Sequence, residues 1–303
     1  MNNMKIDKQN GNVAFNDDSH IYWDTTTNDK FISVTTLIEK FAQPFDKNFW
    51  SGYKALEKLI PADAWKIERK SLLNTHKIPK ELLNTYDIKE LDFNKAQQDI
   101  LDEWDKTNRE SCERGTKIHA ELENSMYKMG ANVTLKKFGV GGKFVCDKGR
   151  TALDLENGVY PEYLTSRVSP DGILRIAGQI DLLVKQGNEI TIMDWKTNKE
   201  IKQHSGFNTQ TRSSVKMLYP LNTLEDCNYW HYCLQLSTYA WMLQKINPEY
   251  VIKDLILVHF DHNDNQTVYH LPYLKKEVEA MLKFYKKSIF KQEKLAKLKR
   301  IEY

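Results

Sequence analysis

The 303-residue chain lacks long hydrophobic runs and is poor in cysteine. No stretch approaches the roughly 18 consecutive apolar residues that a membrane span requires, so we expect no membrane partner. The four cysteines, Cys112, Cys146, Cys227 and Cys233, include no close CxxC pair, which argues against a zinc knuckle and a disulfide scaffold. Segment 1–12 is polar and has no signal-peptide core, so we expect a cytoplasmic protein.

The composition that remains is that of a globular protein. Apolar residues make up 41% of the chain and charged residues 28%, which excludes wholesale disorder. The formal net charge is only +3, but segment 274–303 alone carries ten Lys/Arg against four Glu. A basic C-terminal helix indicates a polyanion partner, and the alternative is a solvated helix face without a partner.

Hydrophobic periodicity predicts helices in the first half of the chain and strands after residue 157. The expected helices are 48–60, 79–129 with Pro79 at a first helical position, 229–246 and the basic segment 274–303. The expected strands are 20–23, 31–35, 159–168, 173–184, 189–195, 255–260 and 267–271. Three strands, a helix, further strands and a helix in succession indicate an α/β fold with a mixed sheet and helices packed on it.

Acidic residues interrupt two of these strands. The period-two alternation of a strand places Asp194 and Lys196 on the same face as Ile190 and Ile192. That face packs inward, so a carboxylate and an ammonium enter a partly buried place together. Asp181 interrupts the preceding strand, and a hairpin through the turn at 186–188 brings Asp181 close to Asp194.

Two carboxylates in a partly buried place repel each other and are costly to ionise unless a cation joins them. A hard divalent ion with oxygen ligands, Mg²⁺ or Mn²⁺, satisfies this requirement. A neighbouring lysine can then orient a water or stabilise charge that develops on a phosphate. The alternative is a buried Asp–Lys ion pair, with Asp181 capping a turn.

Four short motifs follow one another along the chain. They are Arg114–Glu123 (RGTKIHAELE), Gly178–Asp181 (GQID), Asp194–Thr197 (DWKT) and Gln235–Tyr239 (QLSTY). In this order they resemble the motifs of the PD-(D/E)XK nuclease superfamily, and within it the RecB-type and phage exonuclease-like branch. The resemblance runs from about residue 31 to 245 and implies a restriction-endonuclease-like mixed central sheet flanked by helices.

The resemblance assigns a role to each motif. It implies Asp181 and Asp194 as metal ligands, the carbonyl of Trp195 and His119 as additional ligands, and Lys196 as the catalytic lysine. The alternative for His119 is a hydrogen-bonded histidine in the core. In this interpretation one or two Mg²⁺ or Mn²⁺ ions serve the hydrolysis of DNA, and we expect no iron–sulfur cluster because no cysteine follows the QLSTY motif.

Four further residues complete the expected site. Glu162 occupies a place where phage members carry an acidic residue, which implies a second-metal or outer ligand. Glu123 lies one helical turn past His119 and is expected to hold the imidazole or a water, unless it is a plain surface residue. Gln235 and Tyr239 share a helix face, and the resemblance implies that they contact the lysine or the scissile phosphate region. The alternative for Tyr239 is packing in the core.

The sequence thus favours a metal-dependent deoxyribonuclease, with a phage-type exonuclease in recombination, replication or DNA processing as the leading hypothesis. Its partners are DNA and a recombination or replication protein, and its location is the host cytoplasm if the source is viral. The alternatives are a non-catalytic DNA-binding or assembly protein on a nuclease fold, and a structure- or sequence-dependent endonuclease. We expect an N-terminal region at 1–107, a nuclease core at 108–273 and the basic helix at 274–303.

Overall fold

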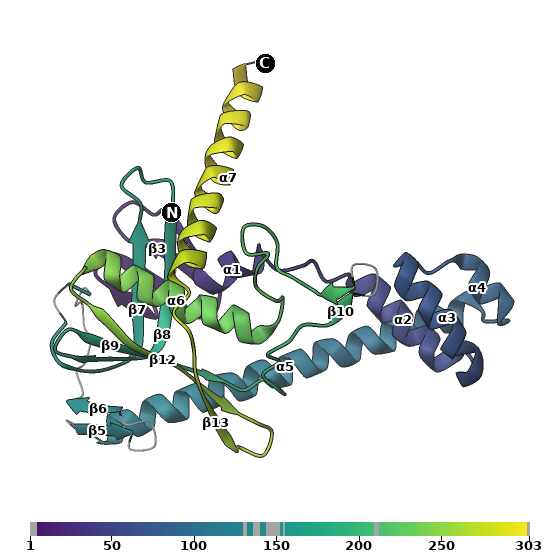
Figure 1. Ribbon diagram of the computed structural model, residues 1–303, viewed down its shortest axis with the longest axis horizontal. Helices are drawn as coiled ribbons and strands as arrows, with labels where there is room; N and C mark the ends of the chain where they lie inside the picture. Colours follow the sequence, from purple (N-terminus) through teal and green to yellow (C-terminus); the bar gives the residue numbers. More distant parts are fainter. Residues whose placement is uncertain are drawn as a thin grey trace. The chain divides into compact units, whose positions relative to one another are not determined.

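The computed structural model describes residues 5–129, 132–135, 140–143, 152–153, 155–208 and 212–301 (Figure 1). The chain forms two compact units. Unit 1 comprises Met1–Ala42, Lys117–Ser205 and Lys216–Tyr303, and unit 2 comprises Gln43–Thr116 and Gly206–Val215. These boundaries differ from the three-part division expected from the sequence, which stays a prediction. Of the four cysteines, Cys146 lies outside the described residues.

Unit 1 contains a mixed sheet, in which the described residues form nine strands. The strands are β1 (Lys8–Asn10), β2 (Val13–Asn16), β3 (Ile21–Asp24), β4 (Lys30–Ser33), β7 (Gly158–Val168), β8 (Arg175–Gln186), β9 (Glu189–Lys196), β12 (Val251–Phe260) and β13 (Gln266–His270). Their order is β1-β2-β3-β4-β8-β9-β12-β13, and β7 pairs with β8. The pairs β4/β8 and β9/β12 are parallel, and the others are antiparallel. The predicted mixed α/β sheet is therefore confirmed.

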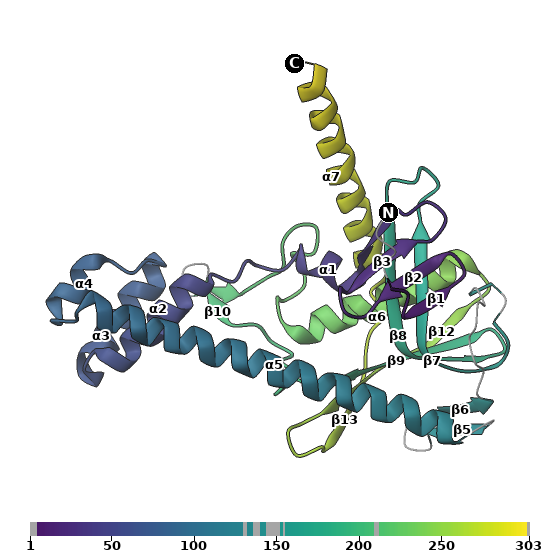
Figure 2. The ribbon, with the colours of Figure 1, turned by 180° about the vertical axis from the view of Figure 1, so that it is seen from behind.

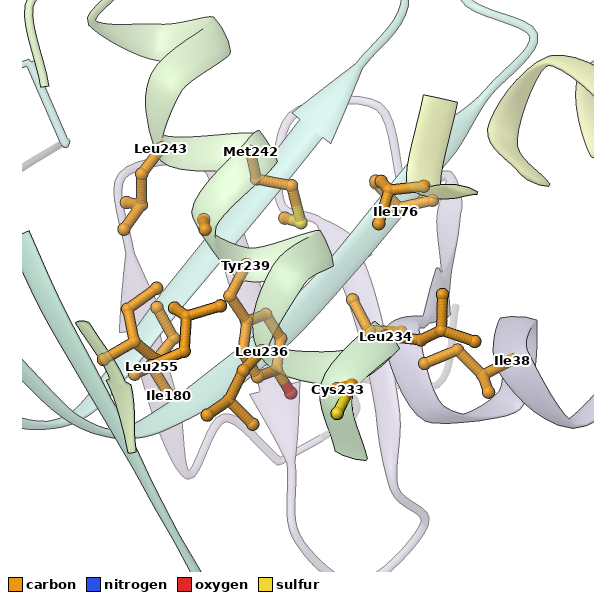
Figure 3. Packing of buried hydrophobic residues seen from close by; sticks show 14 of the residues in the cluster. Ile38, Ile176, Ile180, Cys233, Leu234, Leu236, Tyr239, Met242, Leu243 and Leu255 are labelled. Atoms are coloured by element: carbon orange, nitrogen blue, oxygen red, sulfur yellow. The ribbon is translucent and has the colours of Figure 1, made fainter. Parts of the chain in front are cut away.

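Helix α6 (Asn228–Ile246) packs on one face of this sheet. Figure 3 shows Leu236 and Tyr239 of α6 beside Ile180 and Leu255 of the sheet. Helices α1 (Val34–Glu39) and α7 (Lys275–Ile301) add buried side chains to the same cluster. Full burial of each large aliphatic side chain stabilises the fold by about 1.5–3 kcal/mol, so this layer fixes α6 against the strands that carry the motifs.

The other face of the sheet packs against the C-terminal part of α5 (Glu90–Met129). Met126 of this helix is buried in a cluster with Met193 and Trp195 of β9, and Ile118 and Leu122 are partly buried against it. Because residues three and four apart share a helix face, the same packing directs His119 toward the sheet.

Unit 2 is helical. It contains α2 (Lys47–Leu59), α3 (Ala62–Thr75), α4 (Lys80–Thr85) and the first part of α5, and the short strands β10 (Phe207–Asn208) and β11 (Ser213–Ser214). Its core is aromatic and aliphatic, with buried Phe49, Trp65 and Leu72. A further hairpin, β5 (Asn132–Leu135) with β6 (Val140–Lys143), belongs to unit 1.

Several details of the secondary structure differ from the sequence prediction. The helix expected over 79–129 is divided into α4 and α5, and residues 86–89 lie outside both. Thr35 lies in α1 rather than in a strand, because the side chain of Ser33 caps the helix by accepting a hydrogen bond from the backbone N–H of Thr36. Pro79 precedes α4 as its N-cap residue instead of occupying the first helical position. Helix α3 was not predicted, since only Trp65 and Leu72 are buried along it.

Among the described residues, no helix is both long enough and apolar enough to cross a membrane.

Candidate metal centre

The site lies where one edge of strand β8 passes from pairing with β4 to pairing with β9. The predicted hairpin is confirmed: β8 pairs antiparallel with β9 as far as Leu182 and Met193, and Gly187 supplies the positive φ of +59° at the turn. The start of β8 pairs with β4 through Ile176 and Ala177. On this edge of β8 the GQID motif therefore lies between the β4 and β9 ladders, while its residues Gly178–Ile180 pair with β7 on the other edge.

Asp181 is anchored in this gap. The residue is only 8% exposed, and its Oδ2 accepts a hydrogen bond of 2.7 Å from the backbone N–H of Trp195. Burial, followed by the negative charge of Asp194, raises the pKa of Asp181 to about 7. A carboxyl group with this pKa gains from any cation placed beside it.

Glu162 lies opposite Asp181 on the neighbouring strand β7, between the pairs Pro161–Leu182 and Tyr163–Ile180. Its φ of +51° is in the left-handed region, which costs a non-glycine residue about 1–3 kcal/mol and is concentrated at functional sites. Burial raises the pKa of Glu162, but interactions with His119 and Lys8 outweigh it and lower the pKa below its usual range.

His119 connects the two carboxylates with the main chain of β9. Its Nδ1 lies 3.6 Å from Asp181 Oδ2 and 3.8 Å from Glu162 Oε1, and its Nε2 lies 3.2 Å from the carbonyl oxygen of Trp195. Burial lowers the pKa of His119, whereas Glu162 and then Asp181 raise it by more, to about 9.

The residues present fit a divalent cation. One ligand atom each from His119, Glu162 and Asp181 lie within 4.8 Å of one another, and the Trp195 carbonyl borders the same imidazole. The carboxylate and carbonyl oxygens of this set suit Mg²⁺ or Mn²⁺, and a cation there compensates two buried carboxylates.

Asp194 takes part in a different set of contacts. The residue is 1% exposed, its Oδ2 lies 2.5 Å from Lys196 Nζ, and its Oδ1 accepts a hydrogen bond of 3.2 Å from Gln235 Nε2. Gln235 Nε2 is also 3.3 Å from the hydroxyl of Tyr239. The structure therefore joins Asp194, Lys196, Gln235 and Tyr239 in one network, beside the His119–Glu162–Asp181 group.

The charge state of Lys196 follows from this network. Burial lowers its pKa, but the negative charges of Asp194 and Asp181 raise the pKa well above the usual value. The ammonium also lies 5.1 Å from the ring centre of Tyr232, at a distance typical of a cation–π contact. Both negative charges thus favour the protonated form of Lys196.

The close packing of Tyr239 against β8 explains why the GQID motif begins with a glycine, Gly178. A Cβ atom at this position would lie 2.5 Å from Cε1 of Tyr239, which is closer than real Cβ contacts. Only glycine lets the Tyr239 ring approach β8 and reach Gln235 with its hydroxyl. The packing expected for Tyr239 and its polar contact therefore occur together.

Glu123 is half-buried on α5, and its strongest electrostatic partner is Glu162. Burial and then the charge of Glu162 raise the pKa of Glu123. The expected role in holding the imidazole stays a prediction.

Three contacts were not predicted from the sequence. Lys8 Nζ donates a hydrogen bond of 3.1 Å to Glu162 Oε2, the hydroxyl of Tyr232 donates to Asn198 Oδ1 at 2.7 Å, and a ring nitrogen of His259 lies 2.6 Å from the Asn198 carbonyl oxygen. Each joins segments far apart in sequence and lies in no motif. The pairing of Lys196 with His259 in the parallel β9/β12 ladder brings Asn198 and His259 together, but periodicity alone does not give that register.

Comparison with known proteins assigns the family. The family model of the PD-(D/E)XK nuclease superfamily matches residues 88–300, and the chain belongs to this superfamily. The match includes all four motifs. No curated protein sequence matches the chain.

Two solved structures are similar to parts of the chain. One, from Eubacterium rectale and described as a putative exonuclease, shares 12% identity and has a TM-score of 0.33, with 86% of this chain and 80% of that chain covered. The other, SSO0001, shares 17% identity with a TM-score of 0.24 and covers 42% of this chain. The chain spans about half, 50%, of SSO0001. At these TM-scores neither structure supports an inference about function.

Proposed function

We propose that the protein is a metal-dependent deoxyribonuclease that hydrolyses phosphodiester bonds from a DNA end. The observation that carries the proposal is the convergence of His119, Glu162 and Asp181, within 4.8 Å of one another, beside the ion-paired Lys196. Membership of the PD-(D/E)XK nuclease superfamily supports it.

His119, Asp181, Asp194, Glu162 and the Trp195 carbonyl are proposed to hold one or two divalent cations. When bound there, Mg²⁺ or Mn²⁺ polarises a phosphate oxygen and lowers the pKa of a water. The Trp195 peptide positions the protein ligands, because its N–H holds Asp181 and its carbonyl contacts the imidazole.

Lys196 is proposed to stabilise negative charge on the phosphate. Its raised pKa favours the charged ammonium, which suits electrostatic stabilisation of the phosphate. Asp194 orients the ammonium, and Gln235 holds Asp194 from the opposite oxygen. Tyr239 is a positioning residue that acts through Gln235.

The alternative of a non-catalytic DNA-binding or assembly protein on this fold is disfavoured by the complete set of charges. Asp181, Asp194 and Lys196 are all present. Both carboxylates are buried, and Lys196 is ion-paired with Asp194. An endonuclease uses the same site chemistry, so the form of the DNA distinguishes it from an exonuclease. A role in recombination, replication or DNA processing, with a protein partner, is part of the proposal.

A digestion panel tests the proposal. Linear, nicked, closed circular and single-stranded DNA, each labelled at an end where it has one, are incubated with Mg²⁺ or Mn²⁺ and with a chelator. We expect cleavage of linear DNA only with metal, and no cutting of closed circles. Asp254→Asn is the matched control for Asp181→Asn, because Asp254 pairs with His270 elsewhere on the sheet. Undiminished cleavage in excess chelator contradicts the proposal, and cutting of closed circles replaces the exonuclease with an endonuclease.

A further inference from the structure

Lys8 places a positive charge against the candidate metal centre from the N-terminal strand. Glu162 has two carboxylate oxygens, and they face different partners. Oε1 faces His119 Nδ1 at 3.8 Å, and Oε2 accepts a hydrogen bond of 3.1 Å from Lys8 Nζ. The Glu162 side chain is 11% exposed and that of Lys8 is 30% exposed, so the ion pair is largely shielded from solvent.

The ammonium is held in this position by the strand that carries it. Strand β1 lies beside β2 (Figure 2). In this pairing Lys8 lies opposite Phe15. Two residues further along β1, Asn10 Nδ2 donates a hydrogen bond of 2.8 Å to the carbonyl oxygen of Leu164, two residues beyond Glu162 on β7. The equal spacing on the two strands makes Lys8–Glu162 the second of two anchor points rather than a chance surface contact.

The surroundings of Lys8 are acidic. Beyond Glu162, the charges of Glu123 and Asp17 act on the same region, and the charge of Glu162 raises the pKa of Glu123, after burial, while Lys8 lowers it. Glu162 and Glu123 share a partly buried place, where neighbouring carboxylates are costly to ionise without a cation. In this chain a lysine supplies the positive charge on the outer side of Glu162, as a divalent ion would.

We propose that the Lys8 ammonium takes the place of a second divalent ion, so that the centre binds a single metal ion per chain. The inference rests on the proposed function, because it concerns the number of ions in that same site. A second cation beside Glu162 would need Oε2 as a ligand. The Lys8 ammonium, 3.1 Å from this oxygen, already donates a hydrogen bond to it and would repel that cation. The position of Lys8 thus selects a one-metal mechanism among those available to paired carboxylates.

The test counts bound ions without measuring cleavage. Metal-free protein is titrated with Mn²⁺ alone, and bound Mn²⁺ is counted by calorimetry and by electron paramagnetic resonance, in which two adjacent ions give a spin-coupled signal. We expect one ion per chain for the wild type and no coupled signal. Lys8→Met is expected to bind two ions with a coupled signal, and Lys8→Arg one ion, because the guanidinium keeps the charge.

Lys5→Met is the matched control, because Lys5 lies in the same N-terminal segment and pairs with Asp7 instead of Glu162. It is expected to bind one ion. A folded Lys8→Met variant that still binds one ion overturns the inference. If Lys8→Met does not fold, the number of ions bound by the wild type and by Lys8→Gln tests the inference instead. Two ions in the wild type overturn the inference but leave the proposal of a metal-dependent nuclease intact. Absence of any Mn²⁺ binding to the wild type instead contradicts the proposed function itself.

Discussion

The carboxylate of Asp181 accepts a hydrogen bond of 2.7 Å from the backbone N–H of Trp195, beyond the last pair of the β8/β9 ladder. A side chain thus satisfies a buried main-chain donor that the ladder with β8 leaves unpaired at this point. The carbonyl of the same residue lies 3.2 Å from His119 Nε2. Trp195 of β9 therefore positions both a carboxylate from β8 and an imidazole from α5. Its peptide group can do so because it lies beyond the last β8/β9 pair.

The first prediction concerns the charge of Asp181 in the metal-free protein. The pKa of this carboxyl rises from its ordinary 3.8 to about 7 on folding, so the folded protein binds its proton more tightly than the unfolded chain. The resulting stabilisation is complete below pH 3.8 and is lost as the pH rises through about 7. Asp181→Asn removes this pH dependence, and its amide oxygen still accepts the Trp195 N–H. We expect the melting temperature of the variant, relative to the wild type, to rise between pH 4 and pH 8 in the presence of a chelator.

The same variant is expected to lose metal-dependent cleavage, because the amide cannot replace the charge of a carboxylate ligand. Asp254→Asn serves as the control in the melting experiment, since its carboxylate is on β12 and pairs with His270. A constant difference in melting temperature between Asp181→Asn and wild type across this range would falsify the raised pKa of Asp181.

Local patterns account for what the sequence predicted well. The turn at Gly187 and the alternation along β9 depend on neighbouring residues, so the hairpin and the shared face of Asp194 and Lys196 could be predicted. The buried contact of Asp194 with Gln235 joins residues 41 apart, and the resemblance to a nuclease family, rather than periodicity, singled out Gln235.

Other features depend on tertiary packing and could not be predicted. Lys8 meets Glu162 across 154 residues, and no pattern in the N-terminal strand marks it. The left-handed backbone of Glu162 is held by its strand neighbours, since its residue type does not favour that conformation. Asp181 and Asp194 were expected to share one metal site, whereas the structure places Asp194 against Lys196 and Glu162 beside Asp181. Their roles as ligands stay predictions.

The second prediction concerns the packing of Gly178 against Tyr239. Gly178→Ala introduces a Cβ atom 2.5 Å from the Tyr239 ring, so the ring has to move. Overpacking of this kind costs about 1–3 kcal/mol. We expect a lower midpoint of urea unfolding, and a lower kcat because the shift of Tyr239 disturbs Gln235 and Asp194.

Two variants separate crowding from other effects of the substitution. Gly206→Ala adds the same methyl group where no atom lies within 4 Å, and we expect wild-type stability and turnover. Tyr239→Phe keeps the ring and removes only the hydroxyl that contacts Gln235, so its decrease in stability should be smaller, about 1 kcal/mol. Equal stability of Gly178→Ala and wild type would show that the ring does not need this space.

The third prediction concerns the basic surface of α7. Lys283, Lys287 and Lys291 are exposed on this helix, whereas Lys286 is held 2.5 Å from Asp171. Replacing the three exposed lysines with glutamine should weaken DNA binding. It should also flatten the dependence of log K on log salt concentration, by up to about 0.9 for each phosphate of duplex DNA that the helix no longer neutralises. Binding is measured by fluorescence anisotropy at several salt concentrations. Lys286→Gln alone is the comparison, because its charge is already partnered, and an unchanged slope in the triple variant indicates a solvated helix face.

The fourth prediction separates a catalytic from a structural role for Lys196. Lys196→Ala removes the positive charge 2.5 Å from Asp194, but Gln235 still donates to the other oxygen of that carboxylate. If Lys196 stabilises charge on the phosphate, kcat should fall by about 100-fold or more while DNA and Mn²⁺ still bind. Lys196→Arg should restore little activity, because a planar guanidinium does not fit the place of a compact ammonium over the Tyr232 ring.

A purely structural ion pair predicts a different outcome for the same protein. Breaking a buried pair leaves Asp194 uncompensated and destabilises the fold by about 3–5 kcal/mol, with turnover reduced only as far as the protein unfolds. Single-turnover cleavage and thermal melting of Lys196→Ala therefore have to be measured together, with Lys253→Ala as the control for an exposed ion pair, that with Glu189. A folded variant with slow cleavage supports the catalytic role. A folded variant with wild-type turnover contradicts it, and with it the nuclease mechanism built around this lysine.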